Sequence, residues 1–340
     1  MNIRIERFDL AKATPDELAA HVELAVAAMA ADRPSDPLPS HDSVVAALTT
    51  GFAGRGLPQV WAAYLDDKLA GKGVVSHPTD ENDQLSLIDM QVHPALRRQG
   101  VGTALLREML PAIAAPGRTL AASWNTVADT PAATWAERLG FRVTTRVVVQ
   151  AVDFETVDRT LWEIAAPAGY RAEAWCNTAP DELVESFAKA RTAIEEAQLD
   201  DWTYRLPAWT VERVRQGEAD LKARNAEQRI VAVVHEPTGD VVGLTELVFY
   251  SPEATLGYQY DTAVLPEHRG HGLGAFLKAQ MLRRVAADRP KTKRVNTSTN
   301  AGNESGLRMN RRVGYEAVRT GIAVEIASAE LVARVHATQQ

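Results

Sequence analysis

Arg269-Gly270-His271-Gly272-Leu273-Gly274 is a glycine-rich loop with a counterpart 172 positions earlier, Arg97-Arg98-Gln99-Gly100-Val101-Gly102. Each loop follows a strand-like run that ends in Val-x-Pro, at Val92–Pro94 and at Val264–Pro266, and each leads into a helix-like run. A glycine-rich turn before a helix exposes backbone N–H groups where the helix dipole favours an anion. The two loops therefore predict a duplicated phosphate-binding domain.

Other features repeat at nearly the same spacing. Asp89 recurs as Asp261, and Gly140-Phe141 recurs as Gly314-Tyr315. The helix start at Thr14–Leu18 recurs as Ala179–Leu183, with proline and two acids in the first turn. We predict an N-terminal domain over residues 1–164 and a C-terminal domain over 165–340, joined at a small, turn-rich segment.

Hydrophobic periodicity predicts the same order of elements in both halves: helices, a hairpin, the strand before the loop, a helix, a strand, a helix and a last strand. In the first half we expect helices at 15–29, 42–49, 101–115 and 132–139, and strands at 3–8, 60–65, 69–76, 85–92, 120–124 and 141–152. In the second half we expect helices at 180–196, 211–225, 273–287 and 306–313, and strands at 170–174, 229–235, 241–250, 256–264, 294–299 and 315–325.

Bulk composition narrows the function classes. A length of 340 residues suits two domains of ordinary size. A net charge of −7 argues against non-specific binding to nucleic acid or to an anionic membrane. The single cysteine, Cys176, excludes an internal disulfide and fits a reducing compartment. The sequence has no apolar run near the roughly 20 residues of a membrane span and no signal-peptide core, so we expect a cytoplasmic protein.

Two other phosphate-binding motifs do not fit these loops. A Walker loop needs Gly-Lys-Ser/Thr, which neither copy has, and a dinucleotide fingerprint needs a third glycine where Leu105 and Leu277 stand. The order of Val-x-Pro, arginine, paired glycines and helix instead resembles the acetyl-CoA site of the GNAT acetyltransferase superfamily. The second loop is the closer match, because Arg98 stands in the first copy where the second has Gly270.

The resemblance implies the fold, the reaction and the partners. The fold is α/β, with two tandem GNAT-like domains, each a mixed, largely antiparallel sheet flanked by helices. The reaction is transfer of an acetyl group from acetyl-CoA, as cosubstrate, to an amine of a small molecule or peptide by direct attack. We expect no metal, since His268 and His271 lack further ligands nearby, and a monomer or homodimer. The alternative is a non-catalytic acyl-CoA-binding sensor or regulatory protein.

The resemblance also assigns the residues that bind acetyl-CoA. Backbone N–H groups from Gln99 to Thr103 and from His271 to Ala275 would bind the pyrophosphate, and Arg97 or Arg269 would close the loop or pair with phosphate. Strand backbone would bind the pantetheine arm and polarise the thioester carbonyl; it comes from Met90, Gln91 and Val92 or from Thr262, Ala263 and Val264. Asn303 would either bind CoA or cap a helix.

Three residues of the second half are catalytic candidates. Glu246 lies on an apolar strand face and is either a base or substrate anchor or half of a structural salt bridge; its counterpart is Val74. Asp261 either binds the amine and relays its proton or has a structural role that it shares with Asp89. The usual family tyrosine is replaced by Ala136 and by Asn310, and Asn310 could orient a water or the sulfur.

These differences predict a catalytic C-terminal half and a degenerate or regulatory N-terminal half. Trp202 and Trp209 could line an amine site by cation–π contact, although core or interface packing is the more common use of such residues.

Overall fold

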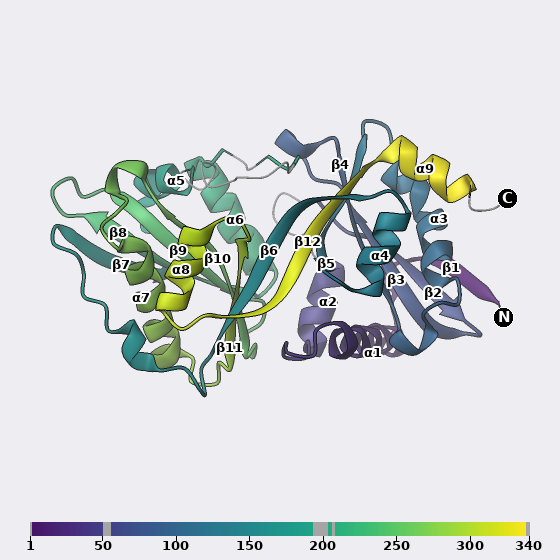
Figure 1. Ribbon diagram of the computed structural model, residues 1–340, viewed down its shortest axis with the longest axis horizontal. Coiled ribbons are helices and arrows are strands. Elements are labelled where there is room, and N and C mark those ends of the chain that lie inside the picture. Colours follow the sequence, from purple (N-terminus) through teal and green to yellow (C-terminus); the bar gives the residue numbers. More distant parts are fainter. Residues whose placement is uncertain (1, 50–55, 193–202, 206–207, 338–340) are drawn as a thin grey trace. The chain divides into compact units, whose positions relative to one another are not determined.

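The computed structural model describes residues 2–49, 56–192, 203–205 and 208–337 (Figure 1). The chain divides into two compact units. The first unit comprises Met1–Arg146, Asp201–Arg205 and Thr320–Gln340, and the second comprises Val147–Asp200 and Leu206–Arg319.

The sheet of the first unit has the strand order β1-β2-β3-β4-β5-β12. Neighbouring strands are antiparallel except for β4 and β5, which run parallel. The last strand of the chain therefore lies beside a strand from the first half, and β12 is the yellow strand in Figure 1. The bounds are β1 (Ile3–Phe8), β2 (Gln59–Leu65), β3 (Lys68–Ser76), β4 (Leu85–Val92), β5 (Leu120–Val127) and β12 (Glu316–Ala327).

The sheet of the second unit repeats this plan with the order β6-β11-β10-β9-β8-β7. Here β10 and β11 are the parallel pair, and β6 from the first half of the sequence pairs antiparallel with β11. The bounds are β6 (Arg142–Asp153), β7 (Tyr170–Cys176), β8 (Glu227–His235), β9 (Val241–Phe249), β10 (Leu256–Val264) and β11 (Arg294–Asn300).

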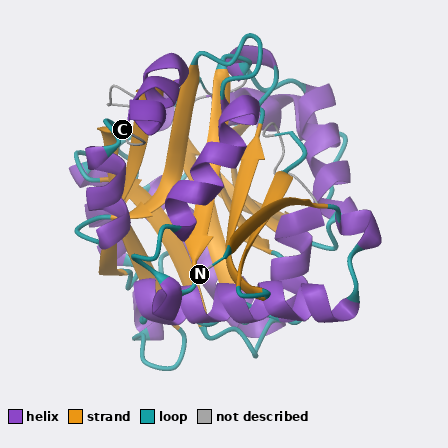
Figure 2. Ribbon diagram, turned by 90° about the vertical axis from the view of Figure 1, so that its right-hand side faces the viewer, coloured by secondary structure: helices purple, strands orange, loops and turns teal. Residues whose placement is uncertain are grey.

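Helices pack on both faces of each sheet, because the apolar side chains of a strand point alternately to one face and the other. Figure 2 shows helices on either side of the strands. In the first unit, Val60 and Val74 pack towards α1 and α2, whereas Trp61 and Val75 pack with α3. In the second unit, Ile230 and Leu244 pack with α5, and Val231 and Val233 pack with α7. The helices are α1 (Pro15–Asp32), α2 (His41–Thr49), α3 (Val101–Ile113), α4 (Pro131–Arg138), α5 (Val184–Thr192), α6 (Val211–Ala223), α7 (Leu273–Asp288), α8 (Glu304–Arg312) and α9 (Ser328–Ala337).

The structure confirms the predicted fold class of two repeated α/β sheets flanked by helices. The compact units differ from the sequence repeat because each repeat gives its last strand, β6 or β12, to the other repeat's sheet. The helix expected at 180–196 begins at Val184, and its predicted end lies outside the described residues. Helix α9 was not expected. In the described part of the chain, no helix is long and apolar enough to cross a membrane.

Helix α9 belongs to the core of the first unit although it ends the chain. Leu331 is fully buried there beside α3 residues, so Leu331→Ala removes apolar contacts and leaves a cavity. We expect it to lower the free energy of unfolding by about 2–5 kcal/mol. The control Leu57→Ala, at a side chain that is 76% exposed, should change it by less than about 0.5 kcal/mol. Urea unfolding followed by circular dichroism measures both, and equal effects would contradict the placement of α9.

Candidate active site

Each glycine-rich loop ends at the start of a helix, and the two helix starts have the same backbone conformation. Gly100 precedes α3 with φ +85° and Gly272 precedes α7 with φ +77°, both in the left-handed region, and neither has a side chain that could cap the helix. The first N–H groups of each helix therefore have no intrahelical partner and face an open loop. This is the geometry that binds an anion such as a pyrophosphate.

The sequence difference between the loops leaves the backbone unchanged. Arg98 has φ +65° where Gly270 has φ +84°, so a bulky residue occupies a left-handed position that favours glycine. Arg97 Nε donates to the carbonyl oxygen of Val92 at 3.2 Å, and Arg269 Nε donates to that of Val264 at 3.0 Å. Each hydrogen bond joins the loop to the end of the strand that precedes it.

Arg97 has a further partner in the first unit. Its two terminal nitrogens donate to the two carboxylate oxygens of Asp32 on α1, both at 2.7 Å. This bidentate ion pair holds the loop against the last residue of α1.

In each unit the strand before the loop separates from its parallel neighbour. Pairing of β4 with β5 runs from Leu85↔Leu120 to Leu87↔Ala122, and pairing of β10 with β11 runs from Leu256↔Arg294 to Gln259↔Thr297. Both β4 and β10 continue for five more residues towards the loop. In the described part of the chain these residues are not paired with the parallel neighbour, a geometry that leaves strand backbone open to an extended ligand.

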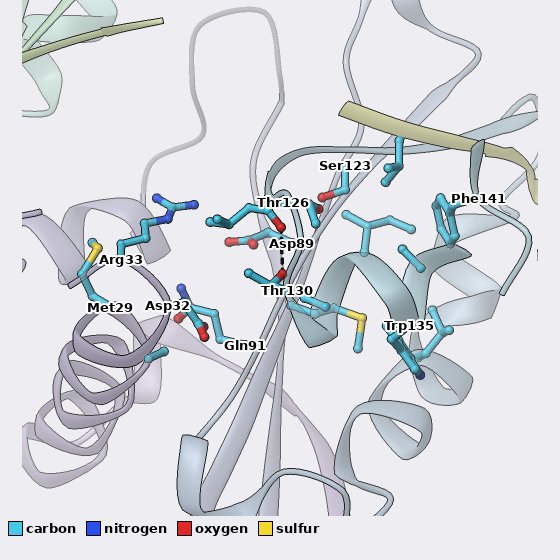
Figure 3. Close-up of a pocket in the computed structure, with 18 residues that line it drawn as sticks. Met29, Asp32, Arg33, Asp89, Gln91, Ser123, Thr126, Thr130, Trp135 and Phe141 are labelled. Atoms are coloured by element: carbon cyan, nitrogen blue, oxygen red, sulfur yellow. Dashed lines mark hydrogen bonds between the residues drawn. The ribbon is translucent and has the colours of Figure 1, made fainter. Parts of the chain in front are cut away.

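A pocket opens at this separation in the first unit (Figure 3). It holds about 1030 Å³ of empty space, including the part open to solvent. Figure 3 shows Asp89, Thr126 and Ser123 between Met29 and Arg33 on one side and Trp135 and Phe141 on the other. Met90 and Gln91, two of the three strand residues expected to bind the pantetheine arm in this half, also line the pocket.

The second unit differs by a β-bulge at the corresponding place. Gln259 pairs with Leu247 and Thr262 with Thr245, so Tyr260 and Asp261 together oppose Glu246. In the first unit the register of β3 and β4 runs without a shift from Gly71↔Val92 to Ser76↔Leu87. Bulges redirect side chains and are common beside active sites.

Charged side chains cluster on the α5 side of this bulge. Arg191 Nη2 lies 2.8 Å from Glu246 Oε2 and 3.6 Å from Asp261 Oδ2. Gln228 also donates its amide to Glu246, and the Arg191 guanidinium lies 3.7 Å from the centre of the Trp209 ring. The Arg191 and Glu246 side chains are only 7% and 9% exposed. Glu246 is therefore held in the structural salt bridge that was one of its two expected roles.

Asp261 is the accessible carboxyl group of this cluster. Its side chain is 36% exposed. Partial removal of the carboxyl group from water raises the pKa of Asp261 to about 6; Arg191 opposes the rise and the Glu246 carboxylate adds to it. A carboxylate with a pKa near the working pH is suited to accept a proton.

The asparagines of α8 have structural partners. Asn310 is buried, and its amide donates to Gln150 at 2.8 Å and to Thr299 at 2.9 Å. Asn303 is the N-cap of α8 and accepts from the backbone N–H of Gly306, which is the capping role expected as its alternative. Trp202 lies outside the described residues.

Sequence reasoning missed Arg191, which joins Glu246 to Asp261. It lies on a helix with lysine at position 189 and looks like an ordinary surface cation. Glu246 on an apolar strand face was a signal that a cation lies nearby, because a buried carboxylate needs a charged partner. Helical or strand periodicity could not show which lysine or arginine is that partner.

Comparison with known families accounts for both halves. A family model described as "Acetyltransferase (GNAT) domain" matches residues 57–143, and one described as "Acetyltransferase (GNAT) family" matches residues 191–315. The chain belongs to the GNAT acetyltransferase family. The predicted tandem arrangement is confirmed, and the protein is an N-acetyltransferase. GNAT acetyltransferases use acetyl-CoA, and the sensor alternative is not favoured.

Relatives of this GNAT protein also span both halves. A mycothiol acetyltransferase of Corynebacterium glutamicum is 27% identical over 264 residues, 77% of this chain and 80% of that protein. A second, from strain R, is 30% identical over 62% of this chain and 63% of that protein. A tandem GNAT protein from the clavulanic acid biosynthesis pathway shares the fold with a TM-score of 0.79, at 21% identity over 96% of this chain and 99% of that one.

The geometry of the Arg191 cluster predicts that two substitutions shift the pKa of Asp261 in opposite directions. Glu246→Gln removes a like charge and should lower the pKa of Asp261 from about 6, whereas Arg191→Met removes an opposite charge and should raise it. Titration of the Asp261 carboxyl carbon by NMR measures both shifts. Shifts of the same sign would contradict the cluster. Because Arg191→Met leaves Glu246 buried and unpaired, Arg191→Lys serves as the variant that keeps the charge.

Proposed function

We propose that the C-terminal half transfers the acetyl group from acetyl-CoA to an amine of a small molecule, with Asp261 as the proton acceptor. The observation that carries this proposal is the charged cluster at the bulge of β10. It places a partly exposed carboxyl group of raised pKa beside the separated end of β10. In the first unit, Val74 opposes Asp89 where Glu246 opposes the bulge.

The donor would bind along the edge of β10 and at the start of α7. The N–H groups from His271 to Ala275 suit the pyrophosphate, because the N-cap of α7 is a glycine with φ +77°. A Cβ added at Gly270 or at Gly272 would meet no atom within 4 Å, so the loop surface is open. The backbone of Thr262, Ala263 and Val264 would bind the pantetheine arm, and one N–H there would polarise the thioester carbonyl.

The transfer is a direct displacement. The neutral amine nitrogen attacks the thioester carbonyl carbon, forming the C–N bond as the C–S bond breaks. Asp261 takes the amine proton, directly or through a water, and the sulfur leaves as the CoA thiolate. Glu246 and Arg191 are positioning residues in this scheme, because Arg191 bridges Glu246 and Asp261.

The first unit would bind acetyl-CoA without transferring the acetyl group. Its loop has the same conformation as the second, and its pocket is bordered by Met90 and Gln91. The relatives named mycothiol acetyltransferases support a small-molecule acceptor, so amines related to mycothiol belong in the acceptor panel.

Asp261→Asn tests the proton acceptor. We expect it to lower kcat by about 10²- to 10⁴-fold, since the amide cannot accept the proton. Release of CoA thiol with a panel of amines is the measurement. Asp89→Asn, the matched change in the first unit, should leave kcat within a factor of about two. Loss of activity in Asp89→Asn with retention in Asp261→Asn would reverse the assignment.

A pair of loop variants tests which donor site supports turnover. Gly272→Val and Gly100→Val each place a β-branched residue at a left-handed N-cap, with φ +77° and +85°, so their local strain is matched. We expect Gly272→Val to abolish thiol release and Gly100→Val to spare it, while calorimetry with acetyl-CoA shows the loss of one binding site in each. Equal losses of turnover in the two variants would contradict the proposal that only the C-terminal half transfers the acetyl group.

A further inference from the structure

A buried polar chain occupies the α7 side of the β10 bulge. Lys278 Nζ on α7 donates to Gln259 Oε1 at 3.3 Å, and the Tyr315 hydroxyl donates to the same oxygen. Gln259 Nε2 donates to Thr245 Oγ1 at 2.8 Å, which in turn lies 2.8 Å from Thr262 Oγ1. The chain therefore connects α7 to the last paired residue of β10 and to the first residue after its bulge.

The first unit has apolar residues at the matching positions. By loop and strand register, Lys278 corresponds to Leu106, Gln259 to Ile88, Thr262 to Met90 and Thr245 to Gly73. Tyr315 corresponds to Phe141, each directly after the glycine that ends the last helix. Leu106, Ile88, Met90 and Phe141 pack in the apolar core of the first unit. The fold itself therefore does not need a polar chain here.

Lys278 is an unusual group to bury. Its side chain is 2% exposed, and burial lowers the pKa of its ammonium to about 7. Within the described residues no carboxylate contributes to that pKa. The titratable group in contact is the Tyr315 phenol, whose ring centre lies 5.0 Å from Nζ and whose own pKa is raised by burial. On the strand side, β9 and β10 contribute the neutral side chains of Thr245, Gln259 and Thr262.

We propose that Lys278 is a positioning residue for acetyl transfer, which holds the β10 bulge through Gln259 and so sets the path of the strand residues that receive the thioester. This inference rests on the proposed function of the C-terminal half. Gln259 is the last residue of β10 paired with β11, and the bulge begins at the next residue. A polar chain anchored on α7 fixes both ends of that bulge, on the face opposite Arg191 and Glu246.

Buried polar groups that lack full compensation reduce stability. We therefore expect replacement of Lys278 by an apolar residue to lower the activity of the protein without lowering its stability. Between about pH 7 and the pKa of a solvated lysine, the unfolded chain binds a proton that folded Lys278 does not. Stability therefore rises with pH in that window. Replacing Lys278 by an apolar side chain should remove this contribution.

Lys278→Met is the decisive variant, because methionine fills similar space without the charge. We expect kcat to fall roughly 10- to 100-fold through misplacement of the thioester, with a smaller change in KM for acetyl-CoA because the loop is untouched. The thermal midpoint at pH 7 should stay the same or rise. Leu106→Met in the first unit is the matched control and should leave kcat unchanged.

Hydrogen exchange makes the test independent of turnover. The amides of residues 260–264 should exchange faster in Lys278→Met than in the wild type, and Gln259→Leu should reproduce that change. Unchanged exchange with unchanged kcat would overturn the inference, as would a fall in kcat that parallels a fall in stability. If wild-type protein released no CoA thiol with any amine, the proposed function would fail, and exchange at β10 would still decide the role of Lys278.

Discussion

One extra residue in β10 is the constraint on which the C-terminal site depends. Because Tyr260 and Asp261 share a single opposite residue, the strand bends where it leaves β11. The bend brings Asp261 to the side where Arg191 and Glu246 lie and leaves Gln259 on the side of Lys278. Polar contacts on both faces hold a conformation that strand pairing alone would not specify.

The two repeats show how the same backbone plan serves different purposes. Their loops share a left-handed glycine before the helix, Gly100 or Gly272, and the arginine that binds the strand-end carbonyl. Their interiors differ, because the first unit places Leu106, Ile88 and Phe141 where the second has Lys278, Gln259 and Tyr315. An apolar core needs no compensating partners, so the polar version is best explained by the chemistry beside it.

The exchange of last strands ties the repeats into one chain with two interdependent cores. Strand β12 and helix α9, at the end of the sequence, complete the first unit, and Val324 of β12 borders its pocket. Strand β6 pairs with β11 and supplies Gln150, which holds the Asn310 amide. The pocket of the first unit and the interior of the second unit therefore each contain a residue from the other repeat.

The sequence by itself determined the duplication, the α/β class, the two loops and the order of most strands and helices, because these follow from local patterns: hydrophobic period, paired glycines and helix starts. Asp261 was also a candidate from the sequence, although the recurrence of an acid at Asp89 equally suggested a structural role shared by both repeats. The tertiary structure alone decided which strand pairs with which, since β6 and β12 look alike in sequence and only long-range pairing assigns them. It also decided the partners of Glu246 and the burial of Lys278. Glu246 contacts Arg191, 55 positions away, and Lys278 contacts Gln259, 19 positions away, and contacts at such separations leave no periodic pattern in the sequence.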